Sequence, residues 1–337
     1  MRSSTRLGRE CLALAALAVI LHFSGCNPNS ADPSAIATPV PTPIVVGETP
    51  LTTTSPTPAQ VVDQGAEREE ALRQVKELIE SARENFPGET GIVFVDIDSG
   101  QSLEFNSEKK FESASLMKLV VITELYRLIH LGELDVDHPL TLEEKHIVGG
   151  SGDLKELEPG LTFPVRILAE KMITQSDNTA TQMLTDFLTK EALNKSTTNL
   201  GLTGTTINRD IYDFAAIDQG RDNYITARDA AFLMKEIARD ELPGSKEIHA
   251  VLERQRRNDM IGKGFPEDLK VAHKTGELNG ILHDVGIVYA PKGSYVLVLL
   301  SDGVSDKQKG IEVFANLSQD ILKVYQDATP SPTPSPQ

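Results

Sequence analysis

The sequence predicts an α+β fold in which strands from both ends of one domain form an antiparallel sheet, with an all-helical lobe inserted between them. Two observations support this prediction. Segments rich in β-branched and apolar residues, bounded by turn residues, occur at 91–105 and again at 269–301. Between them, over 115–239, apolar residues recur at helical spacing instead. The two strand regions can share a sheet only if the helical stretch packs beside it.

The domain is expected to begin with an amphipathic helix over residues 67–85, because its apolar residues fall on one stripe. A hairpin follows this helix. Strand segments 91–97 and 102–105 flank Asp98-Ser99-Gly100, a sequence that favours a tight turn. These two strands are therefore expected to pair with each other.

The helical middle contains three clear segments, at 115–131, 165–174 and 179–188. In the first, Leu119 and Ile122 belong to a series of apolar residues spaced three or four positions apart. This spacing puts one face of the helix against a core.

Strands return in the last third of the chain. Segments 269–274, 281–289 and 295–301 are expected to complete the sheet, and Pro291-Lys292-Gly293 forms the turn between the last two. A closing helix over 307–325 is expected to join the first helix in covering one face of the sheet.

Residues 1–25 have the features of a secretory leader, since arginines precede an apolar run that is too short to span a bilayer. The leader ends at Phe23-Ser24-Gly25-Cys26, which resembles a bacterial lipoprotein cleavage box. We therefore expect lipidation of Cys26 and a membrane-anchored lipoprotein outside the cytoplasm, in the periplasm or on the outer cell surface. The alternative is an ordinary signal peptide with an incidental cysteine.

Composition divides the rest of the chain into three parts. Residues 26–65 are rich in proline, threonine and serine and are expected to form an extended tether. Residues 66–327 form the folded domain, expected to be a monomer. Residues 328–337 are a proline- and serine-rich tail that cannot bury a core.

Charge and histidine placement exclude several classes of function. The net charge is −16, and removal of the leader, with three arginines and one glutamate, changes it to −18. Such a charge opposes binding to nucleic acid. The seven histidines are scattered without metal-ligand spacing, and there is no glycine-rich phosphate loop. No metal and no organic cofactor is expected.

The string Ser115-Leu116-Met117-Lys118 opens the helix expected over 115–131. Three residues make nearly one helical turn, so the Ser115 hydroxyl and the Lys118 amine share a face. A serine at a helix start also offers its own unpaired N–H to a developing oxyanion. A second string of this form, Ser107-Glu108-Lys109-Lys110, lies in a polar turn and lacks this setting. The alternative for Ser115 is a helix-start serine with a solvated lysine.

Two further strings follow in order along the chain. Ser176-Asp177-Asn178 is a short joint between helices, where a hydroxyl and an amide could point into a cleft; helix capping is the alternative. Lys274-Thr275-Gly276 ends a strand, where a cation and a hydroxyl suit a substrate carboxylate; an ordinary strand end is the alternative. Together the three strings supply a nucleophile, a base, a proton relay and an anion anchor, as acyl transfer through a covalent serine ester requires.

The three strings resemble the signatures of class A β-lactamases and the related penicillin-binding proteins. Their separations, 61 residues from Ser115 to Ser176 and 98 from Ser176 to Lys274, are similar to those of that family. The resemblance covers residues 66–327 and implies a β-lactamase-like fold and a serine hydrolase. It also implies a substrate that is a β-lactam or a peptidoglycan stem peptide, and no cofactor.

The resemblance implies a role for each residue of the first two strings. Ser115 attacks the amide carbonyl, Lys118 takes its proton, and Ser176 passes a proton to the leaving nitrogen. Asn178 hydrogen-bonds the amide of the substrate's side chain. The backbone N–H groups of Ser115 and Glu277 form the oxyanion hole.

The third string is implied to bind the substrate. Lys274 and Thr275 hold its carboxylate and bias Ser176, and Gly276 leaves room for the substrate to lie along the strand. Glu277 is unusual beside an oxyanion hole, because a negative charge there disfavours the usual position of the carboxylate.

In class A β-lactamases, a loop between the second and third strings carries a glutamate that activates the deacylating water. Here that loop corresponds to residues 208–229, and Arg209 and Asp222 are expected to close it as an ion pair. No glutamate lies between them, and Ile211 falls near the glutamate's place. Three aspartates are possible substitutes: Asp210, Asp213 and Asp218.

The missing glutamate divides the functional hypotheses, since general-base help typically contributes about 10²–10⁴-fold. The first hypothesis is a β-lactamase-family hydrolase that is acylated at Ser115 and turns over slowly. The alternative is a penicillin-binding D,D-peptidase acting on D-Ala-D-Ala stems. Two non-catalytic hypotheses are a β-lactam or wall sensor and a structural envelope lipoprotein with an inactive fold. The presence of all four reactive side chains argues against the last.

Overall fold

The computed structural model describes residues 58–291 and 293–326. The expected leader, the lipidation site Cys26, most of the expected tether and the tail 328–337 lie outside these residues. Within them, no helix combines the length and the apolar character that a membrane span needs.

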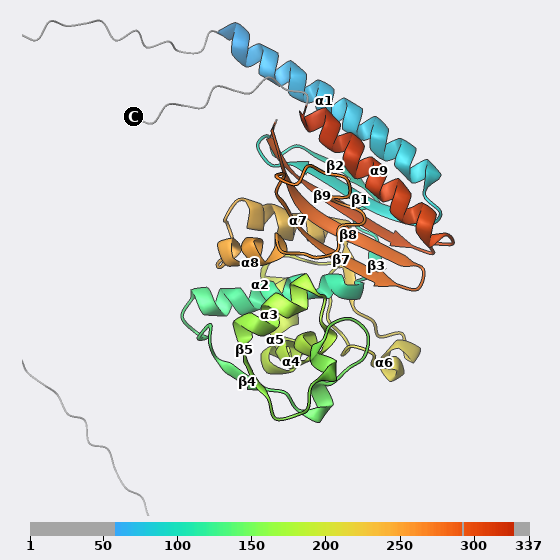
Figure 1. Ribbon diagram of the computed structural model, residues 1–337. Helices are drawn as coiled ribbons and strands as arrows, with labels where there is room; N and C mark the ends of the chain where they lie inside the picture. The colour runs from blue at the N-terminus through green and yellow to red at the C-terminus, as the bar shows by residue number, and fades with distance from the viewer. Residues whose placement is uncertain (1–57, 292, 327–337) are drawn as a thin grey trace, which may run out of the picture. The chain divides into compact units, whose positions relative to one another are not determined.

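The centre of the domain is a five-stranded antiparallel sheet that joins strands from both ends of the chain, as predicted (Figure 1). The spatial order is β2-β1-β9-β8-β7. The first hairpin joins the C-terminal strands through β1 and β9, where Ile92 lies opposite Leu299. The strands are β1 (Glu89–Asp96), β2 (Ser102–Phe105), β7 (Val271–Leu278), β8 (Ile281–Ala290) and β9 (Gly293–Asp302).

Helices α1 (Pro58–Asn85) and α9 (Lys307–Gln326) lie side by side on one face of this sheet (Figure 1). Phe86, directly after α1, stacks on Phe314 of α9 with ring centroids 4.4 Å apart. Phe94 of β1 belongs to the same buried cluster. The two terminal helices therefore seal one side of the sheet, as predicted.

The first helix begins earlier than the sequence indicated. It starts at Pro58, within the stretch 26–65 assigned to the tether, and not at residue 67. Proline lacks the backbone N–H that a first helical residue leaves unpaired anyway, so it is well tolerated at this position.

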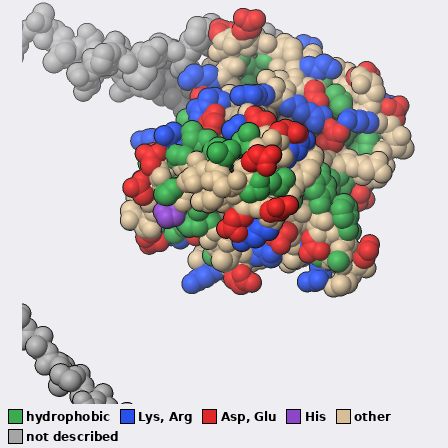
Figure 2. Space-filling view, turned by 60° about the horizontal axis from the view of Figure 1, so that its bottom comes forward, with side chains coloured by type: hydrophobic (Ala, Val, Ile, Leu, Met, Phe, Trp, Pro, Cys, Tyr) green, Lys and Arg blue, Asp and Glu red, His purple; other side chains and the backbone are tan. Residues whose placement is uncertain are grey.

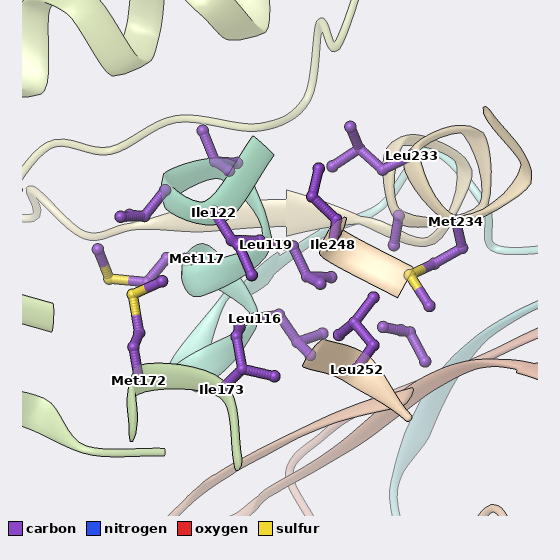
Figure 3. Packing of buried hydrophobic residues seen from close by; sticks show 14 of the residues in the cluster. Leu116, Met117, Leu119, Ile122, Met172, Ile173, Leu233, Met234, Ile248 and Leu252 are labelled. Carbon is purple, nitrogen blue, oxygen red and sulfur yellow. The ribbon is translucent and has the colours of Figure 1, made fainter. Parts of the chain in front are cut away.

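The opposite face of the sheet packs against the helical lobe. Figure 3 shows Leu116, Leu119 and Ile122 among side chains of three neighbouring helices. Every residue from Met117 to Tyr126 is buried, so the helix that carries Lys118 is enclosed on all sides. The helices are α2 (Met117–His130), α3 (Val165–Thr174), α4 (Asn178–Leu188), α5 (Lys190–Asn199), α6 (Phe214–Asp218), α7 (Ala227–Ala238) and α8 (Ser245–Leu252).

Several short elements were not predicted. Strands β3 (Lys110–Glu112) and β6 (Tyr224–Thr226) pair with each other, as do β4 (Pro139–Thr141) and β5 (Thr162–Pro164). Three residues are too few to show a period of two, so such strands exist only through their distant partners. Three short 3-10 helices were also missed, because three residues make a single turn and show no helical periodicity: η1 (Ala114–Leu116), η2 (Glu144–His146) and η3 (Leu154–Glu156).

Two expected boundaries also change. The segment expected to be helical from Ser115 begins as the 3-10 turn η1, and the α-helix starts at Met117. The strand expected to end at Lys274 continues to Leu278, because the hydrogen-bonded register with β8 persists through Gly276, which lies opposite His283. The string Lys274-Thr275-Gly276 is thus the middle of an edge strand.

Candidate active site

The three strings meet in one hydrogen-bonded group, which we call the nucleophile cluster: Ser115, Lys118, Ser176 and Lys274. Lys118 Nζ lies 3.1 Å from Ser115 Oγ and 3.0 Å from Ser176 Oγ. The Ser176 hydroxyl lies 2.9 Å from Ser115 Oγ, to which it donates. Lys274 Nζ donates to Ser176 Oγ at 3.2 Å. Side chains separated by 61 and 98 residues in the sequence therefore share one set of hydrogen bonds.

Ser115 is presented by a strained turn. The preceding residue, Ala114, has φ of 45°, in the left-handed region that residues with a Cβ avoid. On the other side of Ser115, Leu116 is fully buried in the core (Figure 3). The turn is thus held between the core and β7, where a Cβ on Gly276 would lie 3.3 Å from that of Ala114.

The string Ser176-Asp177-Asn178 both caps a helix and contributes side chains to the cluster, which are the two interpretations that the sequence left open. Asp177 caps α4, because its carboxylate accepts from the N–H of Ala180 at 2.8 Å. Ser176 has φ of 56°, and this conformation precedes the capped helix. Asn178 points to the cluster, where its Oδ1 accepts from Lys118 Nζ at 2.9 Å.

A loop on the other side of Asn178 forms a wall of the site. The Asn178 side-chain amide donates to the Gly149 carbonyl at 3.0 Å, and its backbone N–H donates to the Ser151 carbonyl at 3.0 Å. The sequence analysis did not assign this loop a role. The glycine-rich run 149–152 was its visible signal, since glycines permit positive φ, as at Gly150 (81°) and Gly152 (99°).

Burial sets the charges of the two lysines. Desolvation lowers the pKa of Lys118 well below its usual range, and the charge of Lys274 adds to this effect, while Asp177 opposes it. Burial likewise lowers the pKa of Lys274 to about 7, against an opposing effect of Asp284 and with help from Arg257. A lysine with so low a pKa can be neutral near physiological pH and can then act as a base.

The residues after Lys274 lie along β7. Thr275 is buried, and Gly276 packs closely against the turn that carries Ser115, so a larger residue there would crowd that turn. Glu277 lies near the end of the strand, where it forms ion pairs with Arg257, at 2.5 Å, and with Lys307.

The charge of Glu277 is therefore compensated, which the sequence did not indicate. Partial burial opposes its ionisation, but the hydrogen bonds from Lys307 and Arg257 outweigh burial and lower the pKa of its carboxyl group. Arg257 and Lys307 come from a loop and from α9, far from Glu277 in the sequence.

The loop after residue 208 is closed by the predicted ion pair. Arg209 Nε lies 2.7 Å from the Asp222 carboxylate, and the two side chains are only 11% and 7% exposed. The aspartates within the loop have other partners. Asp210 pairs with Lys190 at 2.6 Å, and Asp213 caps α6 by accepting from a backbone N–H.

No described aspartate of this loop is hydrogen-bonded to a member of the nucleophile cluster. Asp218 ends α6 and is exposed. The backbone N–H of Ile211 donates to the side-chain oxygen of Gln182, in the middle of α4, at 3.4 Å. The loop is thus firmly attached to the lobe without offering a carboxylate to the serine.

The buried histidines have structural partners. His273 bonds Asp284 at 2.9 Å and Asn258 at 2.6 Å, in the interior beside β7. In residues 58–291 and 293–326, no group of three or more His, Cys, Asp or Glu side chains is arranged to hold a metal ion.

Comparison with known proteins gives consistent matches. The model of the beta-lactamase enzyme family matches residues 70–325. A beta-lactamase of Bacillus licheniformis is 24% identical over 271 residues, which cover 77% of this chain and 86% of that protein.

Solved structures show the same fold. The beta-lactamase from Sphaerobacter thermophilus has a TM-score of 0.69 and 25% identity, covering 75% of this chain and 97% of that one. The structure of PBP-A has a TM-score of 0.67 and 27% identity, with coverage of 76% and 96%. A leucine-to-glutamate mutant of PBP-A, solved as an acyl-enzyme complex with penicillin G, matches with a TM-score of 0.68.

Proposed function

Because the chain belongs to the beta-lactamase enzyme family, we propose that it is a serine hydrolase whose Ser115 is acylated by β-lactams, with slow turnover of the acyl-enzyme. The observation that carries the proposal is the nucleophile cluster, in which one buried lysine reaches both serine hydroxyls. A serine is a weak nucleophile at its ordinary pKa, so it needs such a base.

Acylation uses the cluster in two proton transfers. Neutral Lys118 takes the Ser115 proton as Oγ attacks the carbonyl carbon, and the oxyanion is stabilised by the N–H groups of Ser115 and Glu277. The tetrahedral intermediate then collapses. Ser176 gives its proton to the leaving nitrogen as the C–N bond breaks, and it recovers a proton from the lysines that it contacts.

Substrate binding involves the edge strand and the joint between helices. Charged Lys274, with the Thr275 hydroxyl, attracts the substrate carboxylate, while Gly276 keeps the strand close to the nucleophile. Asn178 holds the amide of the substrate's side chain. Its amide nitrogen has two hydrogens, of which one is used by Gly149, so one hydrogen remains to donate.

Hydrolysis of the ester has no assigned base, which supports slow turnover. Asp210 and Asp213 are bonded to Lys190 and to a helix N-terminus, and Ile211 cannot accept a proton. Deacylation without general-base help is expected to be slower by about 10²–10⁴-fold.

The lack of an assigned base for hydrolysis of the ester also favours a second candidate, a D,D-peptidase that cleaves D-Ala-D-Ala stems of peptidoglycan. A peptidase of this kind needs no base that destroys a β-lactam adduct. The similarity to PBP-A, one of whose mutants was captured with penicillin G, is in accord with this candidate. A sensor without turnover would bind β-lactams but release no D-alanine.

The test is covalent labelling followed by release. A fluorescent penicillin is expected to label the wild-type protein in a burst and to stay attached for many minutes. Ser115→Ala is expected to abolish labelling, and the matched change Ser107→Ala, in the second S-x-x-K string, should leave it intact. Labelling of the Ser115→Ala protein would refute the nucleophile. Release of D-alanine from a stem peptide distinguishes the peptidase from the sensor.

We also propose that the chain is anchored to a membrane through a lipid on Cys26, on the basis of its sequence. Cys26→Ser should release the protein from membranes or leave an uncleaved precursor. Recovery of soluble wild-type protein without acyl mass on residue 26 would refute the anchor.

A further inference from the structure

The turn after Asp210 holds two aromatic rings away from the core. Tyr212 has φ of 60°, which is costly for a residue with a Cβ. Asp213, with φ of −73° and ψ of 78°, forms an inverse γ-turn in which the N–H of Phe214 donates to the Tyr212 carbonyl at 2.8 Å. The two rings consequently stack, with centroids 5.8 Å apart and planes 24° apart.

The base of this turn is rigid, so the strain at Tyr212 cannot relax by movement of the whole loop. The Arg209–Asp222 ion pair closes it. Asn223 Oδ1 also accepts from the N–H groups of Asn208 and Arg209, at 2.7 and 3.0 Å. Strained conformations persist only when their surroundings impose them, and they gather at functional sites.

The Tyr212 ring lies against the wall of the active site. A Cβ built on Gly150 would be 2.2 Å from the Tyr212 hydroxyl and 2.7 Å from the Asn178 amide nitrogen. The phenol and the amide are therefore close neighbours over Gly150. Because that amide is proposed to bind the amide of the substrate's side chain, the next atoms of a substrate bound in this way would lie beside the Tyr212 phenol.

The rings are also exposed to solvent. Figure 2 shows apolar side chains in patches between charged ones on one face of the molecule. Among the large apolar side chains that are exposed in the described residues, three lie together in this loop: Tyr212 (42%), Phe214 (66%) and Ile217 (36%). Grouped exposed apolar residues, and aromatic ones above all, mark binding surfaces.

We propose that Tyr212 and Phe214 form an aromatic platform that binds the acylamino side chain of the substrate and selects side chains that carry a flat apolar ring. The platform rests on the proposed function, because its effect can be measured only as a change in the acylation of Ser115. Its effect is on substrate choice, since the hydrogen bonds of the nucleophile cluster involve neither Tyr212 nor Phe214. Ring-to-ring contact at such a surface changes affinity by about two- to tenfold.

The experiment compares two penicillins on the full-length protein. Benzylpenicillin carries an aromatic acylamino side chain, and 6-aminopenicillanic acid has a bare amine at the same position. Tyr212→Gly removes the ring and suits φ of 60°, so the variant is expected to fold at least as well as the wild type. Its second-order acylation rate with benzylpenicillin should fall about five- to tenfold, and that with 6-aminopenicillanic acid should change less than about twofold.

Three further variants sharpen the comparison. Tyr212→Phe keeps the ring and should retain the wild-type ratio between the two substrates. Phe214→Ala should lower the benzylpenicillin rate by about two- to threefold. Phe187→Ala is the control: its ring is partly exposed and stacks on His138, about 14 Å along α4 from Asn178, and the ratio should not change.

An unchanged ratio in Tyr212→Gly, with normal acylation, would overturn the platform and leave the proposed function intact. Faster acylation by benzylpenicillin in that variant would also overturn it, because the ring would then be a barrier. If neither penicillin acylates the wild-type protein, the proposed function fails and the platform with it.

Discussion

The nucleophile cluster and the loop 208–222 face the same site, yet their polar groups are used in opposite ways. In the cluster, every reactive side chain is hydrogen-bonded to another reactive side chain. In the loop, three pairs of groups hold the chain in place: Arg209 bonds Asp222, Asp210 bonds Lys190, and Asp213 bonds a helix end. The side chains of the first region bond one another, and those of the second bond the surrounding fold.

This difference indicates that the two halves of a serine hydrolase reaction are separable. In the proposed function, acylation uses a base beside the serine, and Lys118 of the cluster is that base. Hydrolysis would need a base beside a water molecule, and no described aspartate of the loop is hydrogen-bonded to the cluster. The scaffold of the loop can persist without such a base, because the Arg209–Asp222 pair closes the loop whatever lies between them. The difference between the cluster and the loop can be tested by substitutions in either region.

The largest effect is expected from the cluster. Lys118→Arg keeps a long side chain with a terminal nitrogen but removes the base, since a guanidinium does not lose its proton. The acylation rate should fall by about 10³–10⁴-fold, measured by stopped-flow with a reporter β-lactam. Lys235→Arg, on the surface of α7, is the control and should leave the rate unchanged. Acylation of Lys118→Arg at a near-native rate would show that another group is the base.

The next effect concerns the loop. Ile211→Glu places a carboxylate near the position from which the base is missing, and it should speed deacylation by about 10²-fold. Acylation should change less than about threefold, because the cluster is untouched. Ile211→Gln has the same shape without basicity and should leave the adduct long-lived. Intact mass spectrometry of the acyl-enzyme over time reports both rates, and equal lifetimes for the two variants would contradict the assignment.

The charges of the two lysines predict a pH profile for acylation. Lys118 must be neutral, and its lowered pKa means that the neutral fraction grows as the pH rises. Lys274 must be charged to hold a carboxylate, and its pKa of about 7 means that this charge is lost above pH 7. The profile should be bell-shaped, with an alkaline limb near pH 7.

Lys274→Arg should remove the alkaline limb, because arginine stays charged. Relative to its own maximum, the variant should be about tenfold more active at pH 8 than the wild type, since one pH unit beyond a pKa leaves about a tenth of the group charged. An alkaline limb that is unchanged in Lys274→Arg would assign it to another group.

The smallest effect concerns the strained turn before the nucleophile. Ala114→Gly removes about 1–2 kcal/mol of left-handed strain, while it adds flexibility to the unfolded chain worth about 0.4–1 kcal/mol. The net stability should rise by about 0.5 kcal/mol in denaturant unfolding. Ala82→Gly, within α1, should instead lose about 1 kcal/mol. A loss of stability in Ala114→Gly would mean that the turn is not strained.

Local patterns were sufficient for much of the fold. The five sheet strands, the terminal helices and the helix of Lys118 have long periodic segments, so their existence followed from the sequence. The three-residue strands β3 and β6 did not, because Phe111 and Ile225 become a strand pair only when the chain brings them together. The helix boundary at Pro58 was missed because the apolar stripe used to locate the helix begins only at Leu72, although residues 59–66 contain no proline, serine or threonine.

The sequence by itself determined which residues are candidates for the site and what the loop lacks. The three strings identified Ser115, Lys118, Ser176 and Lys274, and the count of carboxylates between Arg209 and Asp222 showed that no glutamate was present. These conclusions depend on residue identity and order, which are local properties.

Only the tertiary structure decided the state of those residues. It buries Lys118 and Lys274 and so lowers the pKa of each, it surrounds Glu277 with two cations, and it directs Asp210 and Asp213 away from the serine. The physical reason is that desolvation and ion pairing depend on atoms that lie far apart in the chain and come together only in the folded core. A sequence pattern can identify a lysine, but the surroundings of that lysine in the folded protein determine its charge.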